Sequence, residues 1–185
     1  MTALRDRLRQ TAALPWSPVS GPVALVTCTA ILWVLALAST GGRWVTVLDH
    51  ANLVFHEAGH LIVGLFSGRL AVYGGTLGQL LFPVAFTVSF WLRRHPVGFA
   101  LAFAWICESL LNIATYMGDA RAMALPLIGG LDPERYHDWR EIFTRWGMLE
   151  LDNAWAALNR VLAWAGGLGI CWWLFRRSLS GKDHG

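Results

Sequence analysis

Long apolar windows constrain this sequence more than any other feature. Residues 22–42 and 70–92 contain no charged side chain, residues 96–118 contain one ionisable group, and residues 155–175 contain one arginine. About 20 apolar residues are enough to cross a bilayer as a helix. The chain is also 55% hydrophobic and only 15% charged. We therefore expect an all-α, multi-pass transmembrane bundle of four or five spans.

The whole chain, residues 1–185, reads as a single integral membrane domain. Its first 21 residues form a basic leader, expected on the cytoplasmic side. The first apolar segment reads as a retained span and not as a cleaved signal peptide, because this leader is long and further apolar segments follow. The expected order is a span over 23–40, a break at 41–43, a helix over 45–66, a segment over 67–92, a helix over 97–124, a loop over 125–139, an amphipathic stretch over 139–152 and a last span over 155–175.

Segment 67–92 allows two interpretations. Gly74-Gly75 is a turn signal inside a β-prone stretch, so the segment is expected either to complete a third span or to re-enter the membrane. The basic residues favour re-entry, because it places the leader, Arg93-Arg94 and Arg176-Arg177 on the cytoplasmic side, as the positive-inside rule prefers. Basic residues gathered at segment ends are topology signals, and they exclude a nucleic-acid footprint.

The sequence HEAGH places two histidines and a glutamate inside an apolar helix. His56 and His60 are four residues apart, so they project from one helix face and can bind one Zn²⁺ together. Glu57 lies beside them, where it can take a proton from a metal-activated water, as in other H-E-x-x-H hydrolases. The plainer alternative is a trio of polar residues that packs helices. Ionisable residues are costly at bilayer depth, which favours the metal site.

The same helix face continues beyond the motif. Asn52 and Asp49 precede His56 at helical spacing, and they could orient an imidazole or simply cap the start of the helix. Gly64 and Gly68 follow His60 and would allow close approach of another helix.

A catalytic zinc needs a third protein ligand and an open position for water. One source is a polar stripe on the helix over 97–124, formed by Glu108, Asn112, Thr115 and Asp119. The second source is YHDW, which contains His137 and Asp138. We favour Asp119, because its helix has the one polar face at a depth similar to that of the two histidines. His137 is the alternative third or fourth ligand, and Asn112 could hydrogen-bond the ligand carboxylate or a substrate backbone.

These motifs resemble the site-2-protease class of intramembrane zinc metalloproteases. The pattern HEAGH…GGTLGQLLFP…YMGDARA…LPLIGG…HDW, over roughly residues 45–150, is similar to a group of small bacterial membrane proteins assigned to that class. The resemblance implies that His56, His60 and Asp119 bind zinc, that Glu57 is the catalytic base, and that Gln79 stands where the class has a substrate-binding amide. It also implies a bacterial cytoplasmic (inner) membrane location and a membrane-anchored protein substrate.

The sequence departs from the class around Asp119. NIATYMGDAR lacks the prolines and the following glycine that the class has around this aspartate. Three functions therefore remain open. The first is an intramembrane zinc endopeptidase. The second is a non-proteolytic membrane protein with a structural or sensory zinc, which a closed site of His56, His60, Asp119 and His137 would favour. The third is a metal or proton transporter.

Overall fold

The computed structural model describes residues 2–40, 45–125 and 136–180, in which helices joined by short connections are present and no strand is found. This confirms the all-α prediction. The break expected at 41–43 and most of the loop expected over 125–139 lie outside the described residues. The helices are α1 (Thr2–Ala13), α2 (Gly21–Ala38), α3 (Thr46–Gly64), α4 (Ala71–Leu92), α5 (Pro96–Gly118), α7 (Asp138–Trp146), the short 3₁₀ helix η2 (Leu149–Leu151) and α8 (Asp152–Ser180).

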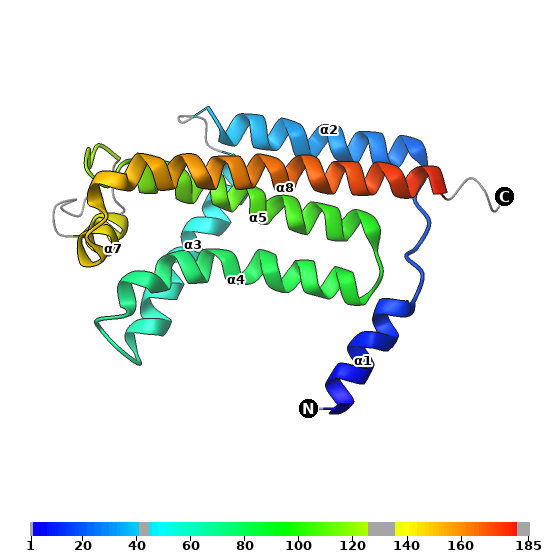
Figure 1. Ribbon diagram of the computed structural model, residues 1–185, viewed down its shortest axis with the longest axis horizontal. Coiled ribbons are helices and arrows are strands. Elements are labelled where there is room, and N and C mark those ends of the chain that lie inside the picture. Colours follow the sequence, from blue (N-terminus) through cyan, green and yellow to red (C-terminus); the bar gives the residue numbers. More distant parts are fainter. Residues whose placement is uncertain (1, 41–44, 126–135, 181–185) are drawn as a thin grey trace.

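Four of these helices run along the long axis of the molecule. Figure 1 shows α2, α8, α5 and α4 lying roughly side by side, whereas α3 runs across this layer and α7 lies at the end where α8 begins. The pairs in direct contact include α3 with α4, α4 with α5, α5 with α8, and α2 with both α5 and α8. The start of α2, the end of α4, the start of α5 and the end of α8 all lie at the opposite end from α7 (Figure 1).

Within the described residues, three helices are long and apolar enough to cross a membrane: α2, α4 and α5. Their outer faces support this reading, because large apolar side chains stand exposed there. Leu25 and Val26 of α2 are 66% and 69% exposed, and Leu81 of α4 is 62% exposed. An apolar surface of this extent is unfavourable in water and favourable against lipid. The structure therefore indicates a membrane protein.

Residues 71–92 form one continuous helix, and the turn that the sequence suggests at Gly74-Gly75 is absent. These glycines serve helix contact instead. A Cβ at Gly74 would lie 2.3 Å from the carbonyl oxygen of Gly59, and a Cβ at Gly59 would lie 2.0 Å from that of Gly74. The close approach is thus made by the glycine inside HEAGH. A Cβ at Gly64 would make only an ordinary 3.7 Å contact, and Gly68 has none.

Helix α7 is amphipathic and docks against the bundle by its apolar face. Trp139, Ile142 and Phe143 are 6%, 1% and 0% exposed, and they pack with residues of α4, α5 and α8. The helix ends at Gly147, whose φ of 66° is the left-handed conformation that glycine adopts most readily. This packing fixes the start of α7, where His137 and Asp138 lie.

Candidate metal centre

Two histidines of α3 and one aspartate of α7 converge. His56 Nε2 lies 2.9 Å from Asp138 Oδ2, and His60 Nε2 lies 3.0 Å from the same oxygen. The two imidazole rings are 4.8 Å apart between centroids and nearly perpendicular, at 77°. Among the described residues this is the one group of three or more His, Cys, Asp or Glu side chains that could hold a metal ion. The predicted pairing of His56 and His60 therefore has a third partner, which is Asp138.

The orientation of His60 suits metal binding. Its Nδ1 lies 2.8 Å from the carbonyl oxygen of Ala71, which can only accept, so Nδ1 carries the hydrogen and donates it. The lone pair of the neutral ring is then on Nε2, the atom that faces Asp138. An outer hydrogen bond of this kind fixes the tautomer and orientation of metal-binding histidines.

The distances fit a small divalent cation. Bonds of about 2.0–2.1 Å in tetrahedral geometry place donor atoms about 3.3 Å apart. The observed distances of 2.9 and 3.0 Å require only a few tenths of an ångström of spreading to reach that value. Two imidazole nitrogens and one carboxylate oxygen are also an ordinary donor set for such an ion. The group could therefore hold a metal ion.

Two hydrogen bonds at the start of α7 hold Asp138 in place. His137 caps the start of α7 by accepting the N–H of Arg140 at Nδ1, and the Asp138 N–H donates to the Tyr116 hydroxyl at 3.1 Å. Burial opposes ionisation of Asp138. When the imidazoles of His56 and His60 are protonated, their hydrogen bonds and positive charge outweigh this effect, so the pKa of Asp138 lies below its ordinary value. The carboxylate is thus ionised and able to bind a cation.

Asp119, the third ligand that the sequence favours, does not lie in this group. It is the residue at which α5 ends, and its carboxylate accepts the N–H groups of Ala124 and Leu125 at 2.9 and 3.0 Å. It also faces His137 Nε2 at 3.3 Å. The structure thus brings Asp138, and not Asp119, to the two histidines, because the carboxylate of Asp119 is used by the turn that follows α5.

His137, the alternative ligand, is also turned away from His56 and His60. Its Nδ1 accepts from Arg140, and its Nε2 faces Asp119, so both ring nitrogens are engaged. Burial lowers the pKa of His137 and favours the neutral ring, which can donate at one nitrogen and accept at the other. Asp119 and His137 are therefore placed to hold the start of α7 and, through it, Asp138.

Glu57 lies beside the group without belonging to it. Its side chain is exposed, and it makes no hydrogen bond within the described part of the chain. It is close enough to His60 and Tyr116 for its charge to act on both. A carboxylate that is adjacent, solvent-accessible and not a ligand is the arrangement expected of a general base.

Helix α4 leaves space in front of the two imidazoles. A Cβ at Gly75 would lie 2.4 Å from His56 Nε2 and 2.6 Å from His60 Nε2, so any other residue would force the imidazoles to shift. Gln79 follows one turn later and is only 6% exposed, and its amide has no hydrogen-bond partner among the described residues. The structure thus places Gln79 on the same helix as Gly75 and leaves its amide free to bind another group.

The two asparagines that the sequence assigns near the metal belong to a separate buried network. Asn52 donates to Glu108 at 2.8 Å and accepts from Trp105 and Ser109. Asn112 donates to Asp49 at 2.7 Å and also contacts Glu108. Neither amide has a hydrogen bond to His56, His60 or Asp138 among the described contacts. Their hydrogen bonds join α3 to α5.

The sequence analysis gave no role to Tyr116, interpreted Gly75 as part of a turn, and gave Asp138 only a secondary place. The sequence does contain an indication for Asp138, which lies at the start of a strongly amphipathic helix. Such a helix is expected to pack against the bundle and to fix the position of its first residues. The signal at Gly75 was ambiguous, since glycine pairs indicate turns as well as close helix contacts.

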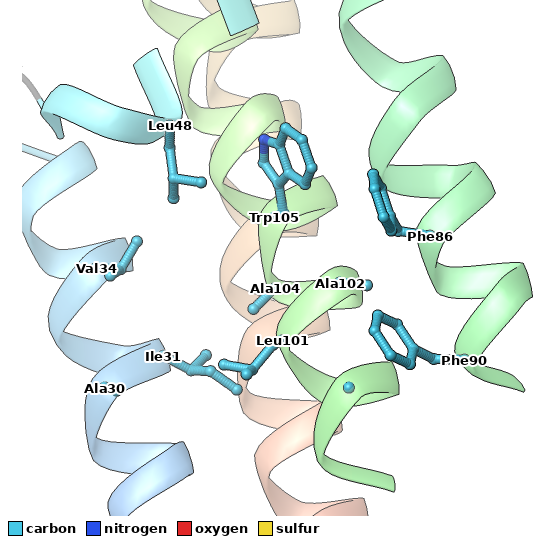
Figure 2. Close-up of a pocket in the computed structure, with 11 residues that line it drawn as sticks. Ala30, Ile31, Val34, Leu48, Phe86, Phe90, Leu101, Ala102, Ala104 and Trp105 are labelled. Atoms are coloured by element: carbon cyan, nitrogen blue, oxygen red, sulfur yellow. The ribbon is translucent and has the colours of Figure 1, made fainter. Parts of the chain in front are cut away.

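A second feature of the described chain is an apolar pocket of about 340 Å³. Figure 2 shows side chains of α2 and α5, together with Phe86 and Phe90 of α4 and Leu48 of α3, turned toward it. The pocket contains no titratable side chain. It is therefore not a second reactive site.

Comparison with family models, with curated proteins and with solved structures found no match.

Proposed function

We propose that this chain is an intramembrane zinc metalloprotease that hydrolyses peptide bonds of a membrane-anchored protein. The observation that carries the proposal is the convergence of His56, His60 and Asp138, with Glu57 beside them on the same helix. Three donors on two separate helices, all aimed at one point, are more than a helix-packing contact needs. The resemblance of the motif pattern to site-2 proteases supports the same reading.

Zinc is the metal that the donor set favours. Two imidazoles and one carboxylate are the ligands of catalytic zinc in several metalloproteases, and such sites keep a fourth position open for water. Neither His137 nor Asp119 is directed at the group, so a closed four-ligand site is not supported. This argues for a catalytic site over a structural or sensory zinc site. When bound, zinc would lower the pKa of a water molecule to about 7 and polarise the substrate carbonyl.

The residues of the chain have separate tasks. His56, His60 and Asp138 hold the ion, and the Ala71 carbonyl orients His60. Glu57 takes the proton from the attacking water and passes it to the leaving amine. Gly75 keeps the space in front of the imidazoles open for water and the substrate backbone. Gln79 then has a free amide one turn away, which is suited to bind a backbone group of an extended substrate.

The membrane arrangement follows from the helices and their charges. In addition to α2, α4 and α5, we propose that α8 crosses the bilayer, with α3 embedded across the layer. Arg93, Arg94, Arg176 and Arg177 then lie at one end of the bundle, opposite α7. The positive-inside rule assigns that end to the cytoplasm of a bacterial inner membrane.

Co-reconstitution tests the proposal. Purified protein would be combined in proteoliposomes with a panel of single-span membrane proteins, and cleavage would be followed by mass spectrometry. Glu57→Gln should keep zinc but lose cleavage, because the amide preserves shape and cannot accept a proton. Asp138→Ala should lose both. If Glu57→Gln lost the metal, Glu57 would be a ligand or a structural residue, and if it cleaved like the unaltered protein, hydrolysis would not use this site.

A further inference from the structure

Two arginines from distant parts of the chain flank one tryptophan at the end of the bundle opposite α7. The Arg94 guanidinium carbon lies 5.0 Å from the ring centroid of Trp16, and that of Arg177 lies 5.5 Å from it. Trp16 lies between α1 and α2, Arg94 lies between α4 and α5, and Arg177 is in the last turns of α8. Three segments thus bring two positive charges to the same indole.

The position of Arg94 is built into the fold. Its side chain is buried, with a relative exposure of 6%, and its backbone adopts a left-handed φ of 53°. Arg94 Nε donates to the carbonyl oxygen of Thr11 at 2.7 Å, and Nη2 also contacts that oxygen. The Arg94 carbonyl accepts from Ser17, and Trp91 packs against the guanidinium at 4.7 Å. One edge of the guanidinium is therefore used by the protein, while Nη1 has no partner among the described residues.

Within the described residues, no carboxylate pairs with either charge. The ion pairs of the described chain lie elsewhere, and none includes Arg94 or Arg177. Arg177 makes no hydrogen bond to any described residue, although it packs against Trp173 at 5.4 Å. Because both guanidiniums lie against the Trp16 ring, their positive charges repel each other. An anion beside both guanidiniums would remove this repulsion.

The surroundings specify which anion fits. Trp91 lies against Arg94, and Trp173 lies against both Arg177 and Trp16. Tryptophans of this kind gather at the level of lipid headgroups. Arginine binds phosphate through paired N–H donors, and basic pockets at helix ends on the cytoplasmic side bind anionic lipid headgroups. The exposed apolar faces of α2 and α4 begin and end here, so acyl chains would lie along them.

We propose that Arg94, Trp16 and Arg177 form a binding site for the phosphate headgroup of an anionic lipid. The site lies at the opposite end of the bundle from α7 and does not depend on the zinc site or on proteolysis. The headgroup of a bound lipid would link α1 to the ends of α4 and α8.

The test uses the full chain, purified in neutral detergent. Phosphatidylglycerol and phosphatidylcholine would be titrated in separate samples, and bound lipid would be measured by native mass spectrometry together with the melting temperature. We expect phosphatidylglycerol to bind more tightly and to raise the melting temperature, while phosphatidylcholine does neither. Glycerol phosphate in a third sample distinguishes a lipid from a free phosphate, and equal affinity for it would overturn the lipid assignment.

Matched variants locate the site. Arg177→Gln should weaken phosphatidylglycerol binding about fivefold, the effect of losing one basic residue near a headgroup. Arg177→Lys should lose less, because it keeps the charge. Arg176→Gln removes an exposed charge from the neighbouring position and should change affinity less than twofold. Equal losses in Arg176→Gln and Arg177→Gln, or equal binding of both lipids, would contradict the proposal. An unchanged melting temperature in phosphatidylcholine shows that the variants are folded.

Discussion

Replacement of Gly75 by alanine should abolish metal binding without adding a charge or removing a ligand. The new Cβ would lie 2.4 Å from His56 Nε2 and 2.6 Å from His60 Nε2, whereas ordinary contacts begin at 3.4 Å. The imidazoles would have to retreat by about 1.0 and about 0.8 Å, but metal–ligand distances tolerate only about 0.2 Å. We therefore expect zinc affinity to fall at least about 100-fold, the upper end of what loss of an outer-shell partner costs.

The matched control is Gly64→Ala, at the end of α3. Its Cβ would meet only the Ala71 Cβ, at 3.7 Å. Both substitutions favour the helix by about 1 kcal/mol, so helix propensity does not separate them. Zinc affinity would be measured by competition with a fluorescent chelator in detergent. If Gly75→Ala bound zinc within threefold of the unaltered protein, the ion would not lie in front of these imidazoles, and the assigned geometry would be refuted.

Three further predictions concern other parts of the structure. Phe143→Ala removes a side chain with 0% exposure and should lower the free energy of unfolding by about 3–5 kcal/mol; a loss below about 1 kcal/mol in denaturant titration would contradict the docking of α7. Zinc should be released as the pH falls, because the ligands must be deprotonated to bind metal; dialysis at a series of pH values followed by metal analysis checks this. Single cysteines would be introduced after the native cysteines are replaced. Arg93→Cys and Ser180→Cys should react with an impermeant thiol reagent from one side of the membrane, and Glu141→Cys from the other. Labelling of all three from one side would disprove the proposed membrane arrangement.

The local part of the metal centre could be predicted because it depends on one helix. A spacing of four residues places His56 and His60 on the same face of any α-helix, whatever surrounds it. The all-α class could also be predicted, because an apolar segment of bilayer length almost always forms a helix in a membrane.

The third ligand could not be predicted in this way, because it depends on how α7 packs. Asp119 and Asp138 are both carboxylates in the second half of the chain. The choice between them is made by the docking of Trp139, Ile142 and Phe143 against the bundle. The polar stripe of α5 was assigned to the metal site for a related reason. Glu108 and Asn112 bond to Asp49 and Asn52 of α3, a contact that helical spacing alone does not reveal.

The glycines of α4 show a different limit. A pair such as Gly74-Gly75 lowers helix propensity, which indicates a turn in water-soluble chains. In this bundle the lost propensity is offset by contact between the backbones of α3 and α4, where Gly59 and Gly74 nearly touch. The helix that packs against such a glycine therefore determines whether the glycine forms a turn or a close helix contact.

Metal content tests the central claim most directly. The unaltered protein and Asp138→Ala would be purified in parallel, loaded with zinc, passed through a desalting column and analysed by inductively coupled plasma mass spectrometry. The ligand set of His56, His60 and Asp138 predicts about one zinc per chain in the unaltered protein and almost none in Asp138→Ala. Equal zinc in the two samples, or none in the unaltered protein, would contradict it.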